Sequence, residues 1–122
     1  MLSGVLVGES LRGGAELSGV PLTLTRVRRV SGAGAADGQP ADWTLLDFEA
    51  EERHAQALAA ALADCLSPDG GWYADFRSDT EVYVVFAGRV CHYRRGDAAG
   101  RERAVAHARS MGVPETQLDW AG

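Results

Sequence analysis

The chain contains no lysine, and all twelve of its basic residues are arginine. Seventeen acidic residues give it a formal net charge of -5. This balance disfavours a general nucleic-acid binder, because such proteins gain affinity by neutralising phosphates. The missing lysine, together with abundant Ala and Gly, indicates a GC-rich coding sequence rather than a recognition function. A local patch of arginines is the alternative that would still allow nucleic-acid binding: Arg26, Arg28, Arg29, Arg94 and Arg95.

Cysteine and long apolar runs are also scarce. Cys65 and Cys91 have neither CxxC spacing nor a nearby His pair, so we expect two small buried side chains, with no metal and no cofactor. The motif GAGAAD (32–37) lacks the third glycine of a dinucleotide-binding fingerprint. No apolar run approaches the roughly eighteen residues of a membrane span, and the amino terminus lacks a basic start. These absences predict a cytoplasmic protein without a membrane partner.

The length and composition predict one domain over residues 1–122. The hydrophobic fraction of 46% and the charged fraction of 24% are typical of a soluble globular chain that folds without a metal or disulfide. Residues 1–20 are rich in glycine and are expected to form a poorly defined arm, with a short strand around residues 5–7. Residues 31–42 have the composition of a flexible loop.

The remaining segments predict an α+β fold. Thr- and Val-rich segments indicate strands at 21–30 and 43–49, and an apolar stripe indicates a helix within 50–66. Three short strands are expected over 72–93, followed by a helix that Asp97 caps and Gly112 ends. The order is β-β-α-β-β-β-α. We therefore expect an antiparallel sheet of four to five strands with two helices on one face, an arrangement that includes ferredoxin-like variants.

The strands of 72–93 can be given a register. A turn at residues 78–80 pairs Asp75 with Tyr83 and Arg77 with Glu81, and a two-residue turn at residues 87 and 88 pairs Tyr83 with His92. In this register the large rings Trp72, Phe76 and Phe86 share one face, which we expect to be the core. The opposite face then carries two polar rows: Asp75, Tyr83 and His92 in one, Arg77, Glu81 and Arg94 in the other.

The polar rows have two interpretations. Cross-strand pairs on a solvated face need no function. Alternatively, Asp75, Tyr83 and His92 form a catalytic row, in which Asp75 fixes the tautomer of His92 and Tyr83 polarises a substrate oxygen. In that case Arg77 and Arg94 would bind an anionic group of a small-molecule ligand.

A third interpretation is a protein interface. Trp43 and Leu45 alternate onto one face of their strand and could form an apolar patch. Trp120 near the carboxyl terminus indicates a tail docked on the body, or else an anchor for a partner. We expect His54 and His107 to be packed or surface residues.

The strings WYADF, EVYVVFAGRV, GD and GVPETQLDW resemble a family of small uncharacterised bacterial proteins. The resemblance covers approximately residues 43–120, and VPETQLDW is its most distinctive part. It implies a small intracellular domain, usually alone on its chain, and brings no catalytic residue or cofactor with it.

Taken together, the residues predict a binding module that forms a homodimer through its open sheet face. The alternative is a small enzyme or small-molecule-binding protein.

Overall fold

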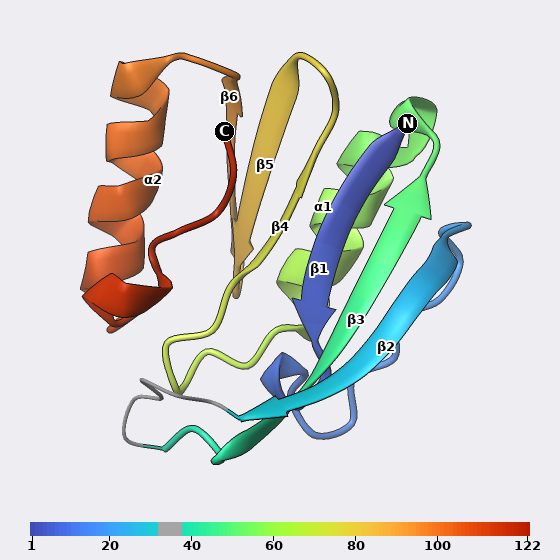
Figure 1. Cartoon of the computed structure of the whole chain (residues 1–122), viewed down its shortest axis with the longest axis vertical. Coiled ribbons are helices and arrows are strands. Elements are labelled where there is room, and N and C mark those ends of the chain that lie inside the picture. Colours follow the sequence, from blue (N-terminus) through green and yellow to red (C-terminus); the bar gives the residue numbers. More distant parts are fainter. Residues whose placement is uncertain (32–37) are drawn as a thin grey trace.

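The computed structural model describes residues 1–31 and 38–122, which form one six-stranded antiparallel sheet and two α-helices (Figure 1). The strands are β1 (Leu2–Val7), β2 (Thr23–Ser31), β3 (Asp42–Ala50), β4 (Ala74–Arg77), β5 (Glu81–Phe86) and β6 (Arg89–Arg94). The helices are α1 (Ala55–Cys65) and α2 (Ala98–Ser110). The strand order is β2-β3-β1-β4-β5-β6. The predicted α+β class and element order are confirmed, with six strands instead of four to five.

The amino terminus forms a central strand: the short strand predicted around residues 5–7 is present, and β1 extends it to Leu2–Val7 in place of a poorly defined arm. β1 pairs with β3 on one side and β4 on the other, so it joins the two halves of the sheet. Gly4 permits this position, because a β-carbon there would lie 2.5 Å from the Asp75 carbonyl oxygen and 2.6 Å from the Phe76 β-carbon. Glycine in a strand often marks such a close approach. Residues 32–37, which hold the GAGAAD motif and much of the predicted loop, lie outside the described residues.

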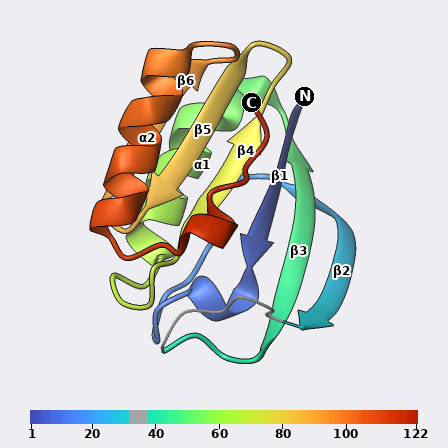
Figure 2. The same ribbon diagram turned by 60° about the vertical axis from the view of Figure 1, so that its left-hand side comes forward.

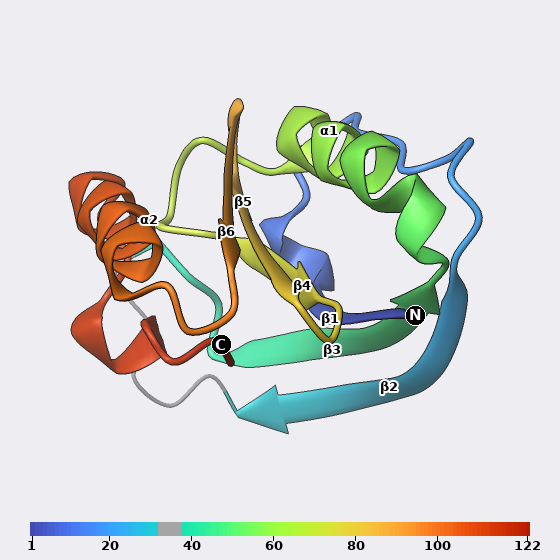
Figure 3. The ribbon, with the colours of Figure 1, turned by 90° about the horizontal axis from the view of Figure 1, so that it is seen from above.

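The two helices cover opposite faces of the sheet, so the prediction that both lie on one face is wrong. Figure 3 shows β5 and β6 between the two helices. Alternate residues of β5 enter different cores: Tyr83 and Val85 pack with α1, whereas Val82, Val84 and Phe86 pack with α2. A strand buried on both faces has no polar side to offer solvent, and a ferredoxin-like variant with one helical layer does not describe this chain.

The β4–β5 register differs from the prediction by one residue. Asp75 pairs with Val84 and Phe76 pairs with Tyr83. The reason lies in the turn: the Ser78 backbone N–H donates to the Glu81 carbonyl at 2.9 Å, and the Ser78 hydroxyl accepts from the Glu81 N–H at 3.0 Å. These bonds close a loop of two residues instead of three. Because side chains alternate along a strand, this single residue reverses the faces of β4 relative to β5.

Other local predictions are confirmed. The β5–β6 hairpin pairs Tyr83 with His92, and its turn has Gly88 at a φ of +71°, a conformation that suits glycine. The Asp97 carboxylate caps α2 by accepting from the Gly100 N–H at 3.1 Å. Gly112 follows α2 with a φ of +82°. The predicted apolar stripe of the first helix is buried: Ala55, Leu58, Leu62, Cys65 and Leu66.

One sheet surface stays free of helices. We call it the open face: the side of β2, β3, β1 and β4 that faces away from α1. The C-terminal tail, residues 115–122, begins with a 3-10 helix at Glu115–Gln117 and runs between α2 and β1 along the border of this face (Figure 2). Among the described residues, no helix has the length and apolar character needed to cross a membrane.

Candidate functional site

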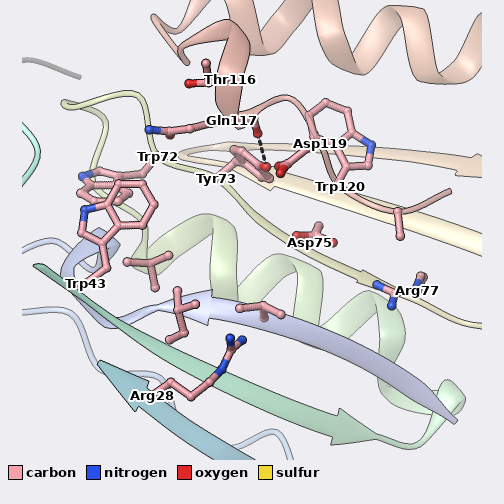
Figure 4. A pocket seen from close by; sticks show the side chains of 14 residues that line it. Arg28, Trp43, Trp72, Tyr73, Asp75, Arg77, Thr116, Gln117, Asp119 and Trp120 are labelled. Carbon is pink, nitrogen blue, oxygen red and sulfur yellow. Dashed lines mark hydrogen bonds between the residues drawn. The ribbon is translucent and has the colours of Figure 1, made fainter. Parts of the chain in front are cut away.

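A cavity of about 440 Å³ lies between the open face and the C-terminal tail (Figure 4). Its floor consists of strand residues, and the tail forms one wall. The residues that line it are Val5, Val7, Arg28, Trp43, Leu45, Trp72, Tyr73, Asp75, Arg77, Thr116, Gln117, Asp119, Trp120 and Ala121. Its size is in the range of small-molecule sites.

Arg101 of α2 holds the tail in place. Its guanidinium donates to the carbonyl oxygens of Leu118, Trp120 and Gly122 at 3.4, 3.0 and 3.2 Å, and it lies 4.8 Å from the centre of the Trp120 ring. The Tyr73 hydroxyl also donates to the Gln117 carbonyl. Because these contacts fix the tail backbone, the cavity wall is preformed.

Aromatic rings make up much of the cavity wall. Trp43 and Trp72 meet edge to face with ring centres 5.3 Å apart, and Tyr73 and Trp120 make a second such pair at 5.3 Å. The chain has three tryptophans in all, so every one of them borders this cavity. Tryptophan and tyrosine present an apolar body together with a polar edge, a composition suited to an amphipathic ligand.

Asp75 is the ionisable residue at the centre of the cavity floor. It lies on β4 between Val5 of β1 and Val84 of β5, and no described residue donates a hydrogen bond to its carboxylate. Burial raises the pKa of Asp75 from 3.8 to about 6; Arg77 acts in the opposite direction, and the charge of Asp119 adds to the increase. A partly buried carboxylate between apolar neighbours is costly for the fold. Such a group is a candidate functional residue.

The other charged residues lie around Asp75. Figure 4 shows Asp119 on the tail side, Arg77 at the end away from Trp43 and Trp72, and Arg28 reaching up from β2. Arg28 donates to the Asp47 carboxylate at 3.3 Å, and its Nε atom is buried without a partner among the described residues. Burial, with the charges of Asp75 and Asp119, raises the Tyr73 pKa above its ordinary value of 10.0, which keeps this phenol protonated.

The structure does not form the predicted catalytic row. Asp75 lies on the open-face side of the sheet, whereas Tyr83 and His92 lie on the other side, because the β4–β5 register differs by one residue. The same difference separates Arg77, which lines the cavity, from Arg94, which pairs with Glu81. Asp75 therefore cannot orient His92, and the two predicted arginines cannot hold one ligand group together.

Tyr83 and His92 do lie together. Their rings stack with centres 4.1 Å apart, and the His92 Nε2 atom is 3.2 Å from a Glu81 carboxylate oxygen. Tyr83 is buried at 8% exposure, and neither Tyr83 nor His92 lines the cavity. This cluster fits the first interpretation of the polar rows, cross-strand pairs at the end of a sheet.

The three predicted interface residues all line the cavity, in different ways. Trp43 and Leu45 lie on the open face, as the alternation along their strand predicts. Trp120 is only 5% exposed, and its indole N–H donates to the Tyr93 hydroxyl at 2.8 Å. The docked-tail interpretation of Trp120 is thus confirmed, and most of the surface of this side chain is buried within the fold.

Three of the five arginines of the predicted nucleic-acid patch are paired with carboxylates. Arg26 and Arg28 contact Asp47 at 2.8 and 3.3 Å, and Arg29 contacts Glu9 at 3.0 Å. Arg94 and Arg95 lie on and just after β6, at the opposite edge of the sheet from β2. The five side chains therefore do not form one patch.

Sequence reasoning missed Trp72, Tyr73 and Asp119 as site residues. Trp72 was expected in the core, and Asp119 stood in the distinctive QLDW ending without an assigned role. The useful signal was Ser78 at the start of the SDT turn. Serine hydroxyls often close tight turns by bonding to nearby backbone N–H groups, and that bond sets the face of Asp75.

Comparison with protein-family models, with curated proteins and with solved structures finds no match to this chain. The family resemblance of residues 43–120 therefore stays a prediction. Within residues 1–31 and 38–122, no group of three or more His, Cys, Asp or Glu side chains is arranged to hold a metal ion.

Proposed function

We propose that this protein binds a small organic molecule in the cavity between the open face and the C-terminal tail. The observation that carries the proposal is the combination of a preformed cavity of about 440 Å³, aromatic walls and the central carboxylate of Asp75. Sites for small molecules in proteins are typically concave and apolar, with a few polar groups that fix the ligand's orientation. This is the small-molecule alternative predicted from the sequence: Asp75 and Arg77 line the cavity, whereas Tyr83, His92 and Arg94 do not.

The position of the tryptophans provides a direct assay. Because Trp43, Trp72 and Trp120 all border the cavity, a bound ligand changes the environment of every tryptophan in the protein. A panel of small aromatic molecules, some cationic, some neutral and some anionic, would be titrated against the intact protein. We expect saturable changes in tryptophan fluorescence and a rise in the thermal midpoint with at least one of them.

Two matched variants test the location. Val7→Phe places a ring in the cavity, whereas Val27→Phe makes the same change on β2 at a position that is 57% exposed and outside the cavity. We expect Val7→Phe to abolish the saturable response and Val27→Phe to preserve it. A panel without any binder, or a response that survives Val7→Phe in a folded protein, would refute the proposal.

Self-association is the second candidate function; the sequence predicts it as a homodimer through the open sheet face, and the structure also offers a sheet edge. The supporting observation is the free edge of β2, where Leu24 and Val27 are 51% and 57% exposed. Arg26, Arg28 and Arg29 lie on the same strand, where each contacts a carboxylate of Asp47 or Glu9. Light scattering of the purified protein decides between monomer and dimer.

The cytoplasmic location expected from the sequence stays a prediction.

A further inference from the structure

We propose that the cavity selects an organic cation, a protonated amine with an aromatic or apolar body, whose ammonium group lies against Asp75. This inference rests on the proposed function and names the class of ligand. It depends on three features of the cavity: Asp75 has no hydrogen-bond partner among the described residues, Arg28 already contacts Asp47, and the walls are aromatic.

Asp75 lacks a partner within the fold. Its neighbours in the sheet are Val5 and Val84, and the described residues give its carboxylate no hydrogen bond. Arg77, the next outward-facing residue of β4, is close enough to favour the charged carboxylate, yet it does not offset the effect of burial. A ligand ammonium group would supply both the missing hydrogen-bond donor and the missing charge.

The charges around Asp75 favour a cation over an anion. Asp119 faces the same space from the tail and makes the potential there more negative. Arg28 is the other cationic group of the cavity wall besides Arg77, and it already contacts Asp47. Arg77 lies at the far end of the cavity from Trp43 and Trp72 (Figure 4), so its charge is distant from these two rings.

The aromatic walls complete the site. Tyr73 and Trp72 precede Asp75 on the chain, Trp43 faces Trp72 from β3, and Trp120 closes the tail side. The faces of the Trp43, Trp72 and Tyr73 rings carry negative partial charge, so they attract a cation as well as an apolar body. The Trp120 ring already has the Arg101 guanidinium 4.8 Å from its centre and supplies apolar surface. A protonated aromatic amine fits both properties of this cavity, since its ring packs on the tryptophans while its ammonium group reaches the carboxylate.

Three probes of similar size test the charge preference: 2-phenylethylammonium, neutral 2-phenylethanol and anionic phenylacetate. Each would be titrated against the intact protein at pH 7.5, where Asp75 is largely ionised, with tryptophan fluorescence and calorimetry as readouts. We expect the cation to bind about tenfold or more tightly than the neutral probe, and the anion to bind most weakly.

The variant Asp75→Asn keeps the shape of the side chain and removes its charge. We expect it to bind 2-phenylethanol as the unmodified protein does and to lose the preference for the cation, so the ratio of the two dissociation constants falls from about ten to about one. The control is Asp79→Asn, an exposed carboxylate in the β4–β5 turn outside the cavity, which should leave the ratio unchanged.

The outcomes separate the two proposals. If 2-phenylethanol or phenylacetate binds as tightly as the cation, or if Asp75→Asn retains the preference, the cavity binds small molecules but the proposed class is wrong. If none of the three probes binds, the small-molecule function itself fails, and the inference fails with it.

Discussion

Asp75 should destabilise the folded protein at neutral pH, and the substitution Asp75→Asn tests this directly. Its pKa is raised by burial to about 6 in the folded state, against an ordinary value of 3.8. A carboxyl group with a raised pKa binds its proton more tightly in the folded state than in the unfolded state. The free energy of unfolding therefore falls as the pH rises from about 4 to about 6, and it levels off above that range.

The size of the effect follows from the two pKa values. Each tenfold change in an acid constant corresponds to about 1.4 kcal/mol, so a change from 3.8 to about 6 corresponds to about 3 kcal/mol. This is an upper figure, because the carboxylate keeps access to water through the cavity. Asparagine cannot ionise, so the variant should lack this penalty. We expect Asp75→Asn to gain up to about 3 kcal/mol relative to the unmodified protein between pH 4 and pH 7.

Urea denaturation at pH 4, 5, 6, 7 and 8 would measure the difference between the two proteins. Comparing them cancels the effects of groups such as Glu9 and Asp47, whose pKa values are lowered and whose contributions have the opposite sign. Asp79→Asn serves as the exposed control. A difference between Asp75→Asn and the unmodified protein that stays constant across this pH range would refute the reasoning, as would a difference that shrinks as the pH rises.

Three further predictions concern packing. Trp120→Ala should lower the free energy of unfolding by about 3–5 kcal/mol and the thermal midpoint by about 10 °C or more, because the indole is buried in the core beside α2. An unchanged melting curve would indicate that Trp120 is not part of that core. Arg101→Ala should lower the free energy of unfolding by about 1–3 kcal/mol and speed amide exchange at residues 118–122, since three carbonyls lose their donor. Arg103→Ala, an exposed position on the same helix, is the control, and unaltered tail exchange in Arg101→Ala would contradict this view. Gly4→Ala should destabilise the protein by about 2 kcal/mol or more in denaturant titrations, because the added β-carbon would collide with the Asp75 carbonyl and the Phe76 side chain of β4. Gly13→Ala is the control and should be neutral, because a β-carbon there would meet no atom within 4 Å.

Much of the fold could be predicted because its signals are local. The stripe that includes Leu58 and Leu62 depends only on the 3.6-residue period of a helix, and both side chains are fully buried. Asp97 and Gly112 mark the limits of α2 through bonds and dihedral angles within a few residues. The placement of the two helices could not be predicted in this way, since it depends on which side of the sheet each connection crosses.

The site was harder to predict than the fold, because it depends on which face of the sheet each side chain points to and on contacts between residues far apart in the sequence. The two hydrogen bonds between Ser78 and Glu81 decide whether the Asp75 side chain shares a face with Tyr83 or with Val84. Asp119 and Trp120 reach the cavity through Arg101, which is 17 to 21 residues away from the carbonyls that it holds. Neither contact has a periodic signature in the sequence.

The sequence by itself determined the strands, the helices, their caps and the β5–β6 hairpin, since each depends on neighbouring residues and on the alternation of apolar side chains. Only the tertiary structure decided that β1 is central, that the helices cover opposite faces, and that the tail closes a cavity over Asp75. The physical reason is that burial of both faces of β5 results from packing between segments far apart in the chain. That packing also leaves one carboxylate facing a cavity lined with aromatic rings.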